Sequence, residues 1–242
     1  QGRGGEWRLT TAERKRILLN NIYGVDIDRQ AVEVTKLSLL LKVLEGENDE
    51  TISKQLKLFQ ERALPDLGNN IKCGNSLIGW DILEDNPNLT QEEIERINPF
   101  DWEKEFPTIF QNGGFDIVIG NPPYIGFHGF KSEKDYLKEL YLSATGKFDL
   151  YLPFIEKGLK LIKNRGFFGY ICPTNFTKRD HGRALRNYIR TSHTIIQIVD
   201  FEDVQIFQGV LNYTGIFIIK SARPSQNHKI SYKSRSLDSA DF

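Results

Sequence analysis

The ten residues FDIVIGNPPY, at positions 115–124, decide the fold that we expect for this chain. The first six form a nearly continuous apolar run, which is typical of a strand covered on both faces in a parallel sheet. The next four contain two prolines, which fix the backbone and cannot continue a central strand. The stretch therefore predicts a buried strand that ends in a rigid polar loop.

The loop Asn121–Tyr124 offers groups that can hold an amino group on a planar ring. The Asn121 carboxamide oxygen and the Pro122 carbonyl both accept hydrogen bonds, so together they can orient an exocyclic amine toward an electrophile. Tyr124 adds a ring on which a base can stack, worth about 1–3 kcal/mol. Because stacking uses the ring, Tyr124→Phe is expected to be mild. The alternative is that the two prolines only end a strand.

Strands alternate with helices on both sides of this loop, which predicts βαβ units and a parallel sheet. The strand at 214–219 follows the one at 195–199 with no long helix between them, so we expect these two to be antiparallel neighbours. The fold class is α/β, a doubly wound and mostly parallel sheet with one antiparallel strand. The expected strands are 22–26, 71–75, 115–120, 167–172, 195–199 and 214–219, and the expected helices are 12–19, 29–44, 90–97, 131–141, 149–163 and 181–190.

Two acidic residues follow the strand expected at 22–26. Ligands of open α/β sheets bind at the carboxyl ends of the strands, where a carboxylate can accept both hydroxyls of a ribose. The alternative is that these acids only cap the next helix. Because two are present, Asp28 can cap the helix at 29–44 while Asp26 binds. We expect Asp26 and Asn121 to lie at one edge of the sheet.

The chain has 32 basic and 32 acidic residues among 242, so contact with a nucleic acid requires a local patch. Residues 157–190 hold nine cations and one acid, Asp180. They are either a wall that faces phosphates or a solvated helix face. We expect His181 to be a surface residue. The candidate phosphate contacts are Lys178, Arg179, Arg183 and Arg186.

Cysteine and hydropathy patterns narrow the class of protein. Cys73 and Cys172 lie 99 positions apart and only four histidines are present, which argues against a disulfide framework or a structural zinc site, and no metal is expected. No apolar run reaches the roughly 18–20 residues of a membrane span, and no signal segment follows Gln1. We expect a cytoplasmic monomer without a membrane partner. The absence of Met indicates a piece of a longer polypeptide.

Six segments, in order along the chain, resemble the N6-adenine DNA methyltransferases of the gamma class, especially those within long type IIG restriction-modification or phage-defence polypeptides. The resemblance runs from about Arg16 to Lys220. It implies a Rossmann-like methyltransferase fold, S-adenosylmethionine as cofactor, and double-stranded DNA with a flipped adenine as partner. The segments are 20–44, 71–78, 121–124, 146–151, 166–173, and 207 with 212–216.

The resemblance also implies roles for single residues. Asp26 would hold the cofactor's ribose, Ile27 would pack on its adenine, and Asn75 would contact the adenine amino group. The full set of implied cofactor-binding residues is Asp26, Ile27, Asn75, Ser76 and Phe148. The implied catalytic residues are Asn121, Pro122, Pro123 and Tyr124, with Phe207 as a second ring against the flipped base.

One motif of that family is absent. A Gly-rich turn after a strand, which cradles the methionine end of the cofactor, should precede Asn20, and Gly2–Gly5 follow no strand. We therefore expect weak cofactor binding and no catalysis from this chain alone. Residues 1–220 are interpreted as a partial methyltransferase catalytic domain, and 221–242 as a linker or the start of a target-recognition domain. The DNA target would be read elsewhere in the parent protein.

Two other functions fit parts of the sequence. Loops like Asn121–Tyr124 also occur in enzymes that methylate glutamine amides of proteins, and the missing Gly-rich turn fits a non-catalytic DNA-binding or scaffold fragment. The acidic stretch at 81–105 is expected to be a solvated insertion. An acid-x-Lys pair occurs only from Glu13 to Lys15, without an upstream Asp, so we expect no DNA cleavage.

Overall fold

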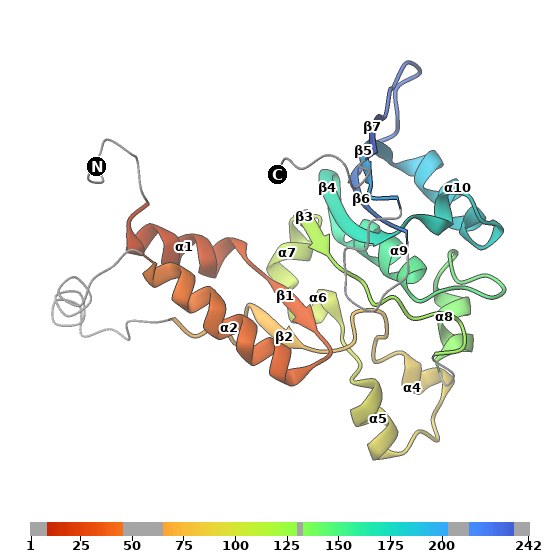
Figure 1. Ribbon diagram of the computed structural model, residues 1–242. Coiled ribbons are helices and arrows are strands. Elements are labelled where there is room, and N and C mark those ends of the chain that lie inside the picture. Colours follow the sequence, from red (N-terminus) through yellow and green to blue (C-terminus); the bar gives the residue numbers. More distant parts are fainter. Residues whose placement is uncertain (1–8, 46–64, 130–132, 203–212, 235–242) are drawn as a thin grey trace, which may run out of the picture. The chain divides into compact units, whose positions relative to one another are not determined.

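The computed structural model describes residues 9–45, 65–129, 133–202 and 213–234 (Figure 1). The chain divides into two compact units. Unit 1 comprises residues 1–76 and 89–99, and unit 2 comprises residues 77–88 and 100–242. Each unit has its own sheet.

Unit 1 is built around a short parallel sheet of two strands. β1 (Gly24–Asp26) pairs with β2 (Ile71–Cys73), and α1 (Thr11–Asn21) precedes β1. α2 (Arg29–Leu44) has the bounds predicted from the sequence, and α5 (Gln91–Ile97) confirms the helix expected near 90–97. The N-cap side chains of the three helices each accept a backbone hydrogen bond, as the capping preference of Thr and Asp leads one to expect; they are Thr10, Asp28 and Thr90.

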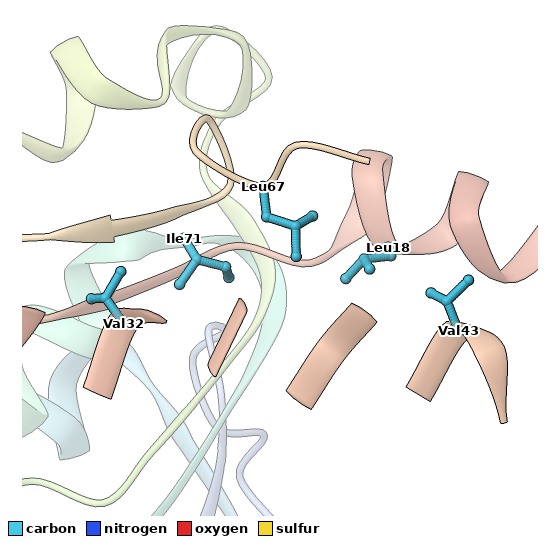
Figure 2. Packing of buried hydrophobic residues seen from close by; sticks show 5 residues of the cluster. All are labelled: Leu18, Val32, Val43, Leu67 and Ile71. Carbon is cyan, nitrogen blue, oxygen red and sulfur yellow. The ribbon is translucent and has the colours of Figure 1, made fainter. Parts of the chain in front are cut away.

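One hydrophobic cluster joins the described helices of unit 1 to its sheet. Figure 2 shows five buried side chains of this cluster, which come from α1, α2, β2 and the turn before β2. Asn70 ties these elements together, because its side-chain Nδ2 donates to the Leu19 and Ile22 carbonyls at 2.8 and 2.9 Å. The Asn70 carbonyl in turn accepts from Gly24 at the start of β1. The core residues are Leu18, Val32, Val43, Leu67 and Ile71.

Unit 2 contains a five-stranded sheet with the order β3-β4-β6-β5-β7 (Figure 1). β3 is parallel to β4 and β5 is parallel to β7, whereas β6 is antiparallel to both of its neighbours. The prediction of an α/β fold with one antiparallel strand is confirmed in this sheet. β1 and β2 form a separate sheet, so the shared edge expected for Asp26 and Asn121 stays a prediction. The strands are β3 (Phe115–Gly120), β4 (Ile162–Pro173), β5 (Thr194–Asp200), β6 (Thr214–Lys220) and β7 (Ser231–Ser234).

The expected cover on both faces of β3 is wrong for the described part of the chain. Ile117 and Ile119 are 62% and 79% exposed, and β3 is an edge strand that pairs only with β4 among the described strands. The apolar run predicted the strand correctly. It could not reveal how much of that strand the described residues cover.

Helix α9 (Tyr151–Leu161) packs on β3 and β4 through a face that includes Leu152, Ile155 and Leu159. A Cβ at Gly158 would lie 2.6 Å from the Phe168 ring, so glycine permits this close packing. No helix within the described residues is long and apolar enough to cross a membrane. The other helices of unit 2 are α4 (Ile82–Asp85), α6 (Trp102–Glu105), α7 (Pro107–Gln111), α8 (Lys134–Leu140), η1 (Thr174–Thr177), η2 (Asp180–Gly182) and α10 (Arg183–Ser192).

The stretch 81–105 is more than the solvated insertion that its acids predicted. It contributes α4 and α6 as well as α5, and Ile82 and Phe100 are buried. The Phe100 ring packs against the Trp102 ring at 5.4 Å between centroids, and Trp102 packs against Phe115 at the start of β3. Its apolar positions, which are spaced too widely to raise the local hydropathy, join the core of their units.

The segment after Lys220 adds an outer strand to the sheet of unit 2. β7 runs parallel to β5, and the Tyr232 hydroxyl donates to Asp200 Oδ2 at 3.0 Å. This part of the tail therefore belongs to the sheet. That a linker or target-recognition domain begins in 221–242 stays a prediction.

Candidate active site

The predicted catalytic loop directly follows the carboxyl end of β3. The strand ends at Gly120, where a Cβ would lie 2.7 Å from the Tyr170 ring of β4, so the approach of the two strands requires glycine. Pro122 is buried, whereas Asn121 is exposed. The Asn121 carboxamide makes no hydrogen bond to any described residue, so both of its polar atoms are available to a ligand.

Contacts beyond Tyr124 anchor this loop. The Leu150 amide donates to the Ile125 carbonyl at 2.9 Å, next to the start of α9. The Phe127 ring packs against Phe148 with 6.1 Å between centroids. Phe148 is fully buried and therefore supports the loop from within. Its predicted contact with a cofactor stays a prediction.

Tyr124 is half-buried, and its hydroxyl oxygen is shielded from solvent. Burial raises the pKa of the Tyr124 phenol above its ordinary value. The phenol is therefore neutral at physiological pH. Phe207, the predicted second ring, lies outside the described residues.

Buried aromatic side chains from α9, η1 and β6 pack against one another. The Phe176 ring of η1 packs against the Tyr151 ring at 6.3 Å and against Phe217 of β6 at 5.0 Å. Cys172 of β4 is fully buried, and that burial raises the pKa of its thiol far above the usual range. A neutral thiol is a poor nucleophile, so the structure gives Cys172 a packing role.

Tyr213 and Thr214, which belong to the family-like segment 212–216 but were given no individual role, lie at the start of β6. Because β6 is antiparallel, its first residue pairs with Pro173, the last residue of β4, and thus lies near the catalytic loop. Tyr213 is 56% exposed and Thr214 is buried. The predicted antiparallel direction of 214–219 was a signal that could have placed both residues there.

The predicted cofactor residues of unit 1 lie at the carboxyl ends of β1 and β2. The Asp26 carbonyl accepts from the Gly74 amide at 2.9 Å, which holds the two strand ends together. Asp28 Oδ1 accepts from the Gln30 amide at 2.8 Å, which confirms its capping role. The Asp26 side chain is exposed and uses Oδ1 for the Asp28 amide, also at 2.8 Å. Its Oδ2 accepts no hydrogen bond within the described part of the chain.

Asn75 and Ile27 complete this group. The side-chain Nδ2 of Asn75 donates to the Ile97 carbonyl at 3.1 Å, so the donor side of the carboxamide is engaged. The backbone amide of Asn75 donates to the Asn98 carbonyl at 2.7 Å. Ile27 is 55% exposed and offers an apolar surface to a planar ring. Ser76, the next predicted contact, is half-buried.

These residues fit the adenosine part of S-adenosylmethionine and leave its methionine part without a cradle. Acceptors for ribose hydroxyls and for an adenine amino group are present at Asp26 and Asn75. Ahead of β1, the described residues contain α1 and no strand followed by a Gly-rich turn. The fit is therefore partial.

Two arginines of the basic segment after β4 bind groups of the protein itself. Arg186 Nη1 donates to the Phe176 and Arg179 carbonyls, and Arg183 pairs with Asp180 at 2.8 Å. A Cβ at Gly182 would overlap the Phe176 carbonyl, so this turn is tightly folded.

The exposed cations of this segment are Lys178, Arg179, Arg183 and Arg190. His181, expected at the surface, is instead half-buried, because the tight turn encloses its Nε2. Arg186 is the predicted phosphate contact whose guanidinium is most engaged with the protein itself.

Comparison with known proteins identifies the family. The model of the Eco57I restriction-modification methylase family matches residues 20–207. The chain is 34% identical over 226 residues to the type II restriction enzyme and methyltransferase RM.Eco57I of Escherichia coli, covering 92% of this chain and 20% of that protein. It is 28% identical over 199 residues to the adenine-specific methyltransferase PglX of Streptomyces coelicolor, covering 78% of this chain and 16% of that protein.

Solved structures show the same fold at low identity. The type ISP restriction-modification enzyme LlaGI, in complex with a DNA substrate mimic, superposes with a TM-score of 0.59 and 14% identity, covering 93% of this chain and 19% of that one. The DrdV–DNA complex superposes with a TM-score of 0.59 and 14% identity, covering 94% of this chain and 22% of that one. The chain spans about a fifth of the length of these proteins. It belongs to the Eco57I restriction-modification methylase family.

Proposed function

We propose that this chain is the catalytic part of a site-specific DNA methyltransferase that transfers a methyl group from S-adenosylmethionine to adenine N6, within a restriction-modification or phage-defence protein. One observation carries the proposal. In a chain of this family, the loop Asn121–Tyr124 follows a strand end and presents a solvent-exposed carboxamide without a hydrogen bond to the described residues.

The loop acts by orientation. Adenine N6 carries two hydrogens, and the Asn121 side-chain oxygen and Pro122 carbonyl are two acceptors that can hold them. Held in this way, the nitrogen lone pair leaves the conjugation of the ring and is directed at an electrophile. When bound, S-adenosylmethionine supplies an electrophilic methyl group. The neutral Tyr124 ring stacks on the base and keeps it in the plane that these acceptors need.

Unit 1 holds the adenosine part of the cofactor in this proposal. Asp26 Oδ2 accepts the ribose hydroxyls, Asn75 Oδ1 accepts the adenine amino group, and Ile27 covers one face of the adenine. Contacts to the methionine part come from the parent protein outside the described residues.

Duplex DNA must release the target base from its stack before the base can reach the loop. The exposed cations Lys178, Arg179 and Arg190 lie on η1–α10, the segment that leaves the carboxyl end of β4, which runs parallel to β3. They are therefore suited to bind phosphates beside the base. Such contacts supply most of the sequence-independent affinity.

The test is to identify the methylated product of the full-length protein. The protein is incubated with labelled S-adenosylmethionine and a duplex that carries its target site, and the DNA is then digested to nucleosides. We expect N6-methyladenine from the parental protein and from Asn112→Ala, which alters an exposed Asn ahead of β3, and almost none from Asn121→Ala. Label on protein glutamine or on cytosine alone, or no transfer at all, would refute the proposal.

A further inference from the structure

One buried carboxylate of unit 2 has no part in the site described above. Glu156 lies in α9 and is fully buried. Burying a carboxylate is costly unless charged and polar groups surround it. The partners of Glu156 therefore indicate what this residue does in the protein.

Glu156 has three polar partners, and two of them are backbone amides. Its Oε1 accepts from the Leu142 amide at 3.2 Å, and its Oε2 accepts from the Ser143 amide at 2.8 Å. The third partner is Lys160, one turn later in α9, whose Nζ lies 2.7 Å from Oε1. The Lys160 side chain is 41% exposed, so the cation that balances the buried charge reaches solvent.

The two amides belong to the connection between α8 and α9, residues 141–150, which forms neither helix nor strand (Figure 1). This connection begins at Tyr141, whose buried hydroxyl donates to the Leu77 carbonyl at 2.7 Å. Ser143 is also fully buried. A buried amide outside helices and strands needs an acceptor from elsewhere in the protein, and Glu156 supplies it. The carboxylate thereby fixes the first half of the connection.

The second half of the same connection holds the chain that follows the loop Asn121–Tyr124. Phe148 packs against the Phe127 ring at 6.1 Å between centroids, and the Leu150 amide donates to the Ile125 carbonyl at 2.9 Å. Ile125 comes directly after the loop, and only residues 144–147 separate the fixed amides from Phe148. A shift of these amides would therefore displace the support of the loop.

We propose that Glu156 is a positioning residue for methyl transfer, because it fixes the α8–α9 connection that supports the loop Asn121–Tyr124. The inference rests on the proposed function, in which Asn121 orients the target base. A buried ion pair adds little stability over apolar side chains of similar volume, but it can specify one conformation. An ionised carboxylate accepts from both amides at once, whereas a carboxamide would place a donor against one of them.

Glu156→Gln keeps the size of the side chain and should lower the single-turnover methylation rate by about 10- to 100-fold. This is the scale of a misplacement of about 1 Å that originates far from the reacting atoms. The affinities for S-adenosylmethionine and for DNA should stay at their parental values. Ser143→Ala is the matched control, because it keeps the backbone amide and removes a buried hydroxyl that makes no hydrogen bond within the described residues. It should keep the parental rate.

The experiment uses the full-length protein and a duplex that carries its target site. Single-turnover methylation and both affinities are measured for each variant, and hydrogen exchange is read in peptides that cover 121–127, 141–150 and β6. In Glu156→Gln, exchange should become faster in the first two peptides and stay unchanged in β6. A merely structural role would change β6 as well.

A double variant tests whether Glu156 acts through the loop. When Asn121 is already Ala, there is no side-chain acceptor left to misplace, so Glu156→Gln should lower the rate less than it does in the parental protein. Losses that multiply would overturn the proposal. So would a parental rate in Glu156→Gln, or exchange that becomes faster in β6 to the same extent.

A second variant decides the result if Glu156→Gln does not fold. Phe127 is half-buried, so Phe127→Leu removes its ring contact with Phe148 at the edge of the core. It should lower the rate by about 3- to 10-fold, the scale of one aromatic contact, and a parental rate would overturn the proposal. If Asn121→Ala is slow while Glu156→Gln is not, only the positioning role fails. If Asn121→Ala keeps the parental rate, the proposed function itself fails.

Discussion

The described residues of units 1 and 2 differ in the size of the sheet and of the core that they form. The sheet of unit 1 has two strands of three residues each, and its core cluster holds five buried side chains. The sheet of unit 2 has five strands, and Phe168, Phe217 and Ile219 are almost fully buried within it. A two-stranded sheet by itself is marginal in water, and the sheet of unit 1 is supported by its packing against α2, whereas unit 2 has five strands of its own.

Helix α2 exposes apolar side chains on the surface of unit 1. Val34, Leu37 and Leu41 are all more than half exposed, and their spacing places them on one face of the helix. In the proposed function, unit 1 binds the adenosine part of the cofactor and unit 2 carries the catalytic loop. The proposed catalytic loop thus follows a strand of a five-stranded sheet, whereas the proposed adenosine contacts follow the strands of a two-stranded one.

Core substitutions give the largest effects and test this difference directly. Phe217→Ala should cost unit 2 about 3–5 kcal/mol, because a buried ring leaves a cavity in a closely packed sheet. Leu18→Ala in unit 1 should cost about 2–3 kcal/mol, near the low end for such changes, because a sparse core can collapse. Hydrogen exchange read separately in β6 and β2 peptides measures both. Equal losses, or a loss from Leu18→Ala that spreads equally through β6, would break the comparison.

The affinity for S-adenosylmethionine tests whether unit 1 binds the cofactor. In the full-length protein, Asp26→Ala should weaken S-adenosylmethionine binding by about 10- to 150-fold, the scale of hydrogen bonds to a charged acceptor. Asp28→Asn keeps the cap of α2 and should leave the affinity unchanged. Calorimetry measures both. An unchanged affinity in Asp26→Ala, or an equal loss in Asp28→Asn, would remove Asp26 from the cofactor site.

The salt dependence of DNA affinity gives the smallest effect. It tests which cations of unit 2 bind phosphates and which bind groups of the protein itself. Lys178→Ala should lower DNA affinity a few-fold and reduce the slope of log K against log salt by about 0.9, because one phosphate contact is lost. Arg186→Ala should leave the slope unchanged and reduce the protection of the η1–α10 turn from hydrogen exchange, because its partners are the Phe176 and Arg179 carbonyls. A slope that falls in Arg186→Ala and stays unchanged in Lys178→Ala would instead identify Arg186 as the phosphate contact.

Much of the fold could be predicted because its signals are local. The bounds of α2 follow from the Asp28 cap and an uninterrupted apolar periodicity, and the direction of β6 follows from the missing crossover helix. The exposure of Ile117 and Ile119 could not be predicted, because an apolar run does not show what covers each face.

The candidate site can be predicted from sequence where one segment carries the proposed chemistry, and not where distant segments meet. Asn121–Tyr124 and the Asp26–Asp28 pair are contiguous, so their sequence shows their chemistry. The pairing of Thr214 with Pro173 depends on strand order in the sheet, and no local pattern encodes it. The internal partners of Arg186 depend in the same way on the tight turn at Gly182.

The most direct test of the central claim is the single-turnover rate of Asn121→Ala in the full-length protein, measured together with its affinity for S-adenosylmethionine. An interaction that forms mainly in the transition state affects the rate more than binding. We predict a rate about 10²- to 10³-fold below the parental rate, the loss of one preorganised polar group, with cofactor affinity unchanged and Asn112→Ala unaffected. Methylation by Asn121→Ala at the parental rate would contradict the assignment of this loop as the site of methyl transfer.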